Sequence, residues 1–133
     1  MKEVVIDTSV WIDFLNGIEN RHTAAMTKIL DSDTEVFITP QIIQEILQGI
    51  NNDNEHDQLK EKLLSLNVLS IDPLESAIGA SSLYRSLRKK GSTIRKTNDV
   101  LIAYYCLYFN IPILHKDRDF EKISNHFRLK IYR

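Results

Sequence analysis

Short runs of aliphatic and β-branched residues alternate with longer amphipathic segments along this chain. The run at 3–6, which ends on Asp7, predicts a short buried strand. Further strands are predicted at "EVFITP" (35–40), "VLSI" (68–71), "IPIL" (111–114) and "RLKIY" (128–132). Because helical segments separate these strands, the pattern predicts an α/β fold with a short, mostly parallel sheet flanked by helices on both faces.

Apolar residues recur at helical spacing between the predicted strands. These segments predict helices over 9–16, 20–31, 53–66 and 119–126. Thr39 followed by Pro40 begins a further helix, since proline at the first helical position gives up a donor that has no partner there. Asp72 and Glu75 have the spacing of a capping box and open a long helix. The segment "NDVLIAYYCLYF" (98–109) is apolar nearly all round, which predicts a helix covered on most sides.

Length and composition fit one ordinary globular domain. The chain has 133 residues, 43% hydrophobic and 26% charged, which predicts a single domain over 1–133 with its own core. The net charge of −1 argues against a uniformly basic coat for nucleic acid but allows a local basic patch. The single Cys106 suits a reducing cytoplasm. No signal peptide and no membrane association are expected, because no segment approaches the ~20 apolar residues of a membrane helix.

Carboxylates from remote segments fall at one edge of the predicted sheet. Asp7 follows the first strand, and Glu45 lies in the second turn of the helix after the second strand. Asp99 opens the helix that leads into "IPIL", and Asp117 follows that strand. Ligand sites in parallel sheets collect at the carboxyl ends of the strands. We therefore expect these four acids to form one catalytic site.

A cluster of carboxylates needs protons or cations as compensation. Two unit charges ~4 Å apart cost about 4 kcal/mol at an intermediate effective dielectric. No histidine or cysteine obviously joins the set, which disfavours zinc. A set of oxygen ligands suits a hard ion, so we expect Mg²⁺ or Mn²⁺ as the cofactor.

Each acid also has an ordinary structural role open to it. Asp7 is placed to cap a helix, and Glu45 taken alone is a common solvated helix residue. Asp99 fits the first turn of a helix as a partner of the helix dipole. Asp117 fits the start of a turn, and Asp119 the cap of the last helix. Singly these roles are the better explanations, but four coincidences at one edge favour a metal site.

Four segments together resemble PIN-domain ribonucleases and, more narrowly, VapC-type toxins of prokaryotic toxin–antitoxin pairs. They are "VVIDTSVWIDFL", "ITPQIIQEIL", "RKTNDVLIAYYC" and "ILHKDRDF", in the order found in that family. The resemblance implies a single PIN-like domain that cleaves single-stranded RNA with Mg²⁺ or Mn²⁺. It puts the family's acidic positions at Asp7, Glu45, Asp99 and Asp117. Two departures stand out, since "IAYYC" replaces smaller residues and "HKDRDF" offers a second aspartate, Asp119.

The expected chemistry is hydrolysis of an RNA phosphodiester bond by a metal-activated water. We expect Asp7 and Asp99, with Asp117, to hold the metal, while Glu45 holds a second ion or positions the water. The resemblance implies products with a 5′-phosphate and a 3′-hydroxyl. An alternative attack by the 2′-hydroxyl needs paired histidines, and the histidines of this chain look scattered. They are His22, His56, His115 and His126.

Accessory residues are expected around the acids. Thr8 and Ser9 either donate hydrogen bonds to Asp7 or a phosphate, or cap the first helix. Asp119 is a further accessory candidate. The stretch "RSLRKKGSTIRK" (85–96) holds six cations and no acid. From it we expect RNA contacts by Arg85, Arg88, Arg95 and Lys96, with a solvated helix end as the ordinary alternative.

The partners follow from the resemblance. It implies a cytoplasmic homodimer that is neutralised by a small VapB-type antitoxin. Trp11, Phe14 and the apolar positions of 20–31 and 53–66 are candidates for a groove or dimer face, unless they simply pack in the core. Two alternatives remain: a PIN-domain nuclease of RNA maturation, or a non-catalytic RNA- or protein-binding module on the same fold.

Overall fold

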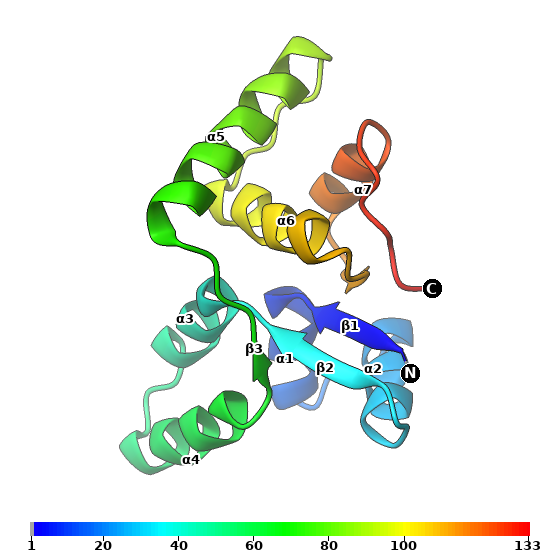
Figure 1. The fold of residues 1–133 in the computed structure, drawn as a ribbon. Coiled ribbons are helices and arrows are strands. Elements are labelled where there is room, and N and C mark those ends of the chain that lie inside the picture. Colours follow the sequence, from blue (N-terminus) through cyan, green and yellow to red (C-terminus); the bar gives the residue numbers. More distant parts are fainter. Residues whose placement is uncertain (1) are drawn as a thin grey trace.

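The computed structural model describes residues 2–133, which form a four-stranded parallel sheet in the order β3-β2-β1-β4 (Figure 1). The strands are β1 (Glu3–Ile6), β2 (Glu35–Ile38), β3 (Asn67–Val68) and β4 (Ile113–Leu114). Each neighbouring pair is parallel, so helices rather than hairpins must connect the strands. The predicted α/β fold with a short parallel sheet flanked by helices is confirmed.

The connecting helices cover both faces of this sheet. Within residues 2–133 they are α1 (Thr8–Leu15), α2 (Arg21–Leu30), α3 (Pro40–Gln48), α4 (Asp53–Leu64), α5 (Pro73–Lys89), α6 (Thr97–Phe109) and α7 (Arg118–Ser124). In Figure 1, α5, α6 and α7 lie on one side of the strands, and α1 and α2 lie on the other. Because both faces are covered, the inner strand β1 is apolar without alternation, and Val4, Val5 and Ile6 are all fully buried.

The order of the strands reverses between β1 and β4. The chain runs outward from β1 through β2 to β3, and then returns to add β4 on the other side of β1. Ligand sites of open parallel sheets lie at the carboxyl ends of the strands at such a reversal. Here the backbone N–H of Asp7 donates to the carbonyl of Leu114 at 2.9 Å, so the ends of β1 and β4 lie side by side.

Three strand predictions need correction. The predicted strand over 128–132 is wrong, because Ile131 forms only an isolated parallel bridge with Ile113. The strand over 111–114 shortens to its last two residues, since Pro112 has no N–H to donate. The strand over 68–71 shifts to Asn67–Val68. The predicted helices are present, with ends that differ by one or two residues.

Helix α6 packs in the centre of the molecule, as its uniformly apolar sequence predicted. Ile102 and Ala103 are fully buried, and Asn110 ends the helix in the left-handed conformation with φ 56°. Asparagine tolerates this conformation better than most residues. No helix within 2–133 is long and apolar enough to cross a membrane.

We expect Ile102→Ala to lower the free energy of unfolding by about 2–5 kcal/mol, because it leaves a cavity beneath α6. Ile12→Ala is the matched control, since Ile12 also lies in a helix but is 42% exposed. Its loss should stay near or below about 0.5 kcal/mol. Urea denaturation followed by circular dichroism measures both, and equal losses would contradict the central position of α6.

Candidate active site

Three aspartates meet beside the ends of β1 and β4. One carboxylate oxygen from each of Asp99, Asp117 and Asp119 lies within 4.8 Å of the others. Asp99 stands in the first turn of α6, whereas Asp117 is the N-cap of α7 and Asp119 lies in its first turn. The backbone N–H of Asp119 donates to the Asp117 carboxylate at 3.0 Å, so the start of α7 fixes these two residues relative to each other.

Asp7 is the N-cap of α1 and is only 4% exposed. The hydroxyl of Ser9 donates to Asp7 Oδ2 at 2.6 Å, and the backbone N–H of Ser9 donates to the same oxygen at 3.2 Å. The cap of the first helix is therefore Asp7 itself. Of the two alternatives left open for Ser9, the structure shows the hydrogen bond to Asp7.

Glu45 reaches the same edge of the sheet from α3. The hydroxyl of Thr8 donates to Glu45 Oε1 at 2.8 Å, which links the first turn of α1 to α3. The start of α3 is fixed as predicted, since Thr39 accepts from the backbone N–H of Ile42 and Pro40 follows it. Burial raises the pKa of Asp7, the hydrogen bonds from Ser9 oppose this rise, and the negative charge of Glu45 adds to it.

Asp99 is the most perturbed acid of the group. It is 5% exposed, and burial raises its pKa to about 7, with further contributions from the charges of Asp7 and Asp117. The charge of Lys96 acts in the opposite direction, and that of Asp119 adds to the rise. Asp7 lies outside the group joined within 4.8 Å, but its charge still reaches Asp99.

The donor set fits a hard divalent cation. Asp99 Oδ2 is buried and has no hydrogen-bond partner within residues 2–133. Such an atom normally finds a partner, because an unpaired buried polar group is costly. Among residues 2–133, the possible ligand atoms that converge here are carboxylate oxygens, and they suit Mg²⁺ or Mn²⁺. Asp7, Asp99 and Asp117 stay the predicted ligands, and Asp119 joins them as a candidate.

Lysines hold the outer acids of the cluster and the loop between β4 and α7. Lys96 Nζ lies 3.8 Å from Asp117 Oδ2, and Lys122 Nζ lies 3.5 Å from Asp119 Oδ1. Lys116, in the loop itself, forms an ion pair with the buried Asp13 of α1. The sequence offered no signal for that pair, because its two residues lie 103 positions apart.

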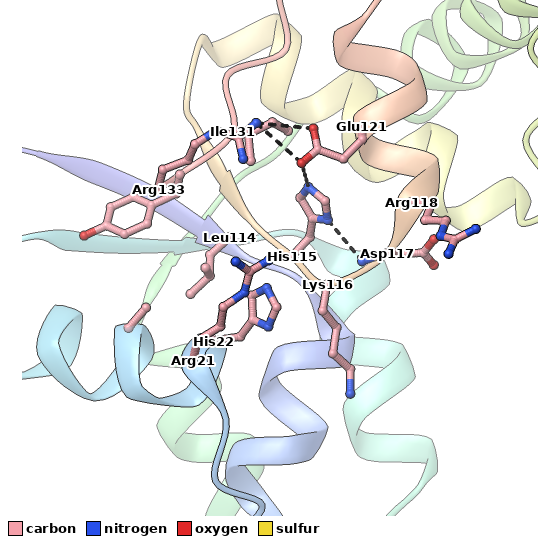
Figure 2. A pocket seen from close by; sticks show the side chains of 12 residues that line it. Arg21, His22, Leu114, His115, Lys116, Asp117, Arg118, Glu121, Ile131 and Arg133 are labelled. Carbon is pink, nitrogen blue, oxygen red and sulfur yellow. Dashed lines mark hydrogen bonds and ion pairs between the residues drawn. The ribbon is translucent and has the colours of Figure 1, made fainter.

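His115 is the first residue of this loop and is buried (Figure 2). Its Nδ1 accepts the backbone N–H of Asp117 at 3.1 Å, so in the neutral ring the proton is on Nε2, 3.8 Å from Glu121 Oε1. Burial lowers the pKa of His115. The expectation that the histidines are scattered is wrong for His22 and His115, which line one pocket.

The basic run approaches the acids at one residue, Lys96. Arg85, Arg88 and Arg95 are exposed, and the guanidinium of Arg88 lies 5.6 Å from the ring centre of Tyr84. This is the solvated arrangement that the ordinary explanation predicts, and it leaves these side chains accessible. Their contact with RNA stays a prediction.

Comparisons with known proteins agree with this architecture. The family model described as PIN domain matches residues 4–125. The "VapC ribonuclease Mb1587" of Mycobacterium bovis and "Ribonuclease VapC11" of Mycobacterium tuberculosis are each 30% identical over 122 residues, covering 91% of this chain and 91% of each relative.

Solved structures with the same fold come from toxin–antitoxin systems. VapBC-1 from nontypeable Haemophilus influenzae superposes with a TM-score of 0.73 at 19% identity, covering 98% of this chain and 96% of that chain. VapC20 of Mycobacterium tuberculosis, titled a "Sarcin-Ricin loop cleaving toxin", has a TM-score of 0.66 at 15% identity and covers 93% and 95%. At these identities the superpositions show the fold alone, whereas the family model and the VapC relatives show descent. The chain therefore belongs to the PIN-domain family, among its VapC-type members.

Proposed function

We propose that this protein is a Mg²⁺- or Mn²⁺-dependent endoribonuclease and the toxin of a VapBC-type pair. The observation that carries the proposal is the buried Oδ2 of Asp99, which has no hydrogen-bond partner within residues 2–133 and lies in a group of carboxylates at the ends of β1 and β4. The names of the VapC relatives supply the substrate class, RNA. The acidic cluster and the substrate class fit together, because hydrolysis of an RNA phosphodiester bond with a metal ion requires a site that binds a cation.

Different residues of this chain would bind the metal ion and orient the groups around it. Asp99 and Asp117, with Asp7 and Asp119 beside them, would hold the metal ion. When bound, the ion supplies positive charge at the scissile phosphate and lowers the pKa of a water. Ser9 keeps Asp7 oriented through the hydrogen bonds that it donates.

Glu45 is a candidate to orient the attacking water or accept its proton. Thr8 holds one of its carboxylate oxygens, Oε1, by a 2.8 Å hydrogen bond. No other hydrogen bond within residues 2–133 engages the carboxylate, so Oε2 is left available for a water. Carboxylates of this kind commonly serve as general bases in hydrolysis.

Two alternatives remain for the biological role. A nuclease of RNA maturation would need the same acids, so the site does not separate it from a toxin. The VapC relatives, which match over 91% of their own length, favour the toxin. A non-catalytic binding module would not need a carboxylate cluster, and the predicted acids are all present in this chain.

The toxin role includes a VapB-type antitoxin, a homodimer and a cytoplasmic location. Several structural neighbours are VapBC pairs, among them those of Haemophilus influenzae and Salmonella typhimurium. Trp11 was a candidate for the docking groove, but it is only 7% exposed and belongs to the core. Ile12, Leu15 and Ile18 on and after α1 are each more than 40% exposed and are better candidates.

Asp99→Asn should reduce RNA cleavage by at least about 100-fold, because it removes the charge that the cation site depends on. Asp57→Asn, on the exposed face of α4, is the control and should retain activity. Single-stranded RNA with Mn²⁺ is the substrate, EDTA should stop the reaction, and mass spectrometry should find 5′-phosphate and 3′-hydroxyl ends. Cleavage that persists in EDTA, or 2′,3′-cyclic ends, would refute the metal-activated water.

The metal-free protein should lose stability as the pH rises. The pKa of Asp99 is about 7 in the folded chain against an ordinary 3.8, so between these values the folded state binds more protons than the unfolded state. From pH 5.5 to pH 8 the wild type should lose about 2 kcal/mol more unfolding free energy than Asp99→Asn.

Chemical denaturation in EDTA at both pH values measures this difference. Burial lowers the pKa values of His22 and His115, which contribute with the opposite sign, but both proteins share these histidines. Mn²⁺ should restore stability to the wild type more at pH 8 than at pH 5.5. Identical pH profiles for wild type and Asp99→Asn would contradict the perturbed carboxyl group.

Replacing Arg95 and Lys96 with glutamine should flatten the salt dependence of RNA binding. The logarithmic slope should fall by about 1.4 if both residues contact phosphates, because each contact to a single strand contributes about 0.7. Binding is measured in Asp99→Asn protein, so that the RNA stays intact. Lys60→Gln, on the exposed side of α4, is the control and should leave the slope unchanged. An unaltered slope in the double variant would show that Arg95 and Lys96 are solvated surface residues that do not contact RNA.

A further inference from the structure

A pocket of about 420 Å³ opens beside the acidic cluster (Figure 2). It is lined by the start of α2, the end of β4, the start of α7 and the C-terminal segment. Asp117 contributes to the lining, so the pocket and the cluster share a wall. The volume lies in the range of sites that bind small molecules. The proposed hydrolysis uses the cluster but gives the pocket no role.

Two arginines in this pocket lack a counter-charge. Its four arginine and lysine residues include Lys116, which pairs with a carboxylate of α1, and Arg133, which pairs with one of α7. Arg21 and Arg118 form no ion pair with any residue in 2–133. A guanidinium fork matches the geometry of phosphate oxygens, and unpaired arginines beside a nuclease site therefore favour a phosphate.

The rest of the lining suits a nucleobase. Leu114, Ile131 and Tyr132 provide apolar and aromatic surface, on which bases of single-stranded RNA commonly stack. His115 adds a buried Nε2–H that has no hydrogen-bond partner within residues 2–133 and lies 3.8 Å from Glu121 Oε1. Figure 2 shows Arg21 and His22 on the side of α2, and Glu121 and Arg133 across from them, with His115 between.

We propose that this pocket receives one nucleotide of the RNA strand next to the bond that is cut. Its phosphate contacts Arg21, and its base packs against Leu114, Ile131 and Tyr132, while Arg118, at the other end of the pocket beside Asp117, contacts the next phosphate of the strand. The inference rests on the proposed ribonuclease function. Lys96 also contacts Asp117 but does not line the pocket, so it offers a further cation to the same strand.

An acidic protein segment is the competing occupant. It would also satisfy the two free arginines, but it has no use for the aromatic and apolar lining. This lining favours the nucleotide.

The binding test uses metal-free Asp99→Asn protein, which leaves RNA intact. A tetranucleotide of single-stranded RNA and a 5′-mononucleotide are titrated in turn, and backbone amide shifts are followed by NMR. We expect shifts at Arg21, His22 and Tyr132 with both probes. In the same background, Arg21→Gln with Arg118→Gln should weaken RNA binding about tenfold or more. Arg128→Gln, exposed and outside the pocket, is the control and should change it by less than about twofold.

The kinetic test uses the chain with its acids intact. The double arginine variant should raise KM for RNA and leave kcat and the affinity for Mn²⁺ unchanged. A change in Mn²⁺ affinity would show that the arginines act through the cluster, and would overturn the proposal.

The outcomes separate this proposal from the function on which it rests. If the wild type cleaves RNA but the double variant keeps its RNA affinity and KM, the pocket proposal is wrong and the nuclease stands. If the wild type fails to cleave any RNA, the nuclease is wrong, and the amide shifts alone decide whether a nucleotide enters the pocket. Shifts with polyglutamate but not with RNA would identify an acidic protein partner instead.

Discussion

Repulsion among carboxylates at the ends of β1 and β4 is the constraint that the local structure accommodates. Asp7 and Asp117 each cap a helix, and Asp99 lies in the first turn of a third. Helix N-termini carry partial positive charge and unpaired N–H groups, so they stabilise the ionised acids that crowd there. Capping and clustering are therefore not competing explanations. The caps are what make it possible to bring these acids together.

This compensation is uneven. The lysines neutralise the outer acids, since Lys96 contacts Asp117 and Lys122 contacts Asp119. Asp99 has no lysine within ion-pair distance among residues 2–133, and burial, with the charges of Asp7 and Asp117, raises its pKa to about 7. A proton neutralises Asp99 below neutral pH, and above it a cation is the remaining means of compensation. A proton and a bound cation would therefore compete for one group of oxygens, and the affinity for the ion would depend on pH.

The sequence predicted which acids lie at the edge of the sheet better than it predicted the contacts between individual side chains there. Strand ends locate Asp7 and Asp117 because the topology of a parallel sheet forces them together, whatever the side chains do. The pair of Lys116 with Asp13 had no such signal, since it depends on side-chain directions across 103 positions. The strand over 128–132 failed for a similar reason, because β4 has only two residues and offers little edge to pair with.

The charge distribution of the chain would couple the binding of a cation to the binding of RNA. With a net charge of −1, the chain as a whole does not attract a polyanion, so attraction depends on local cations within a Debye length of about 8–10 Å. Lys96 is one of these, yet it already contacts Asp117. A divalent ion on the cluster would take over that compensation and would free Lys96 for a phosphate. The factor by which the ion would raise the affinity for RNA equals the factor by which RNA would raise the affinity for the ion, because the coupling between two bound ligands is reciprocal.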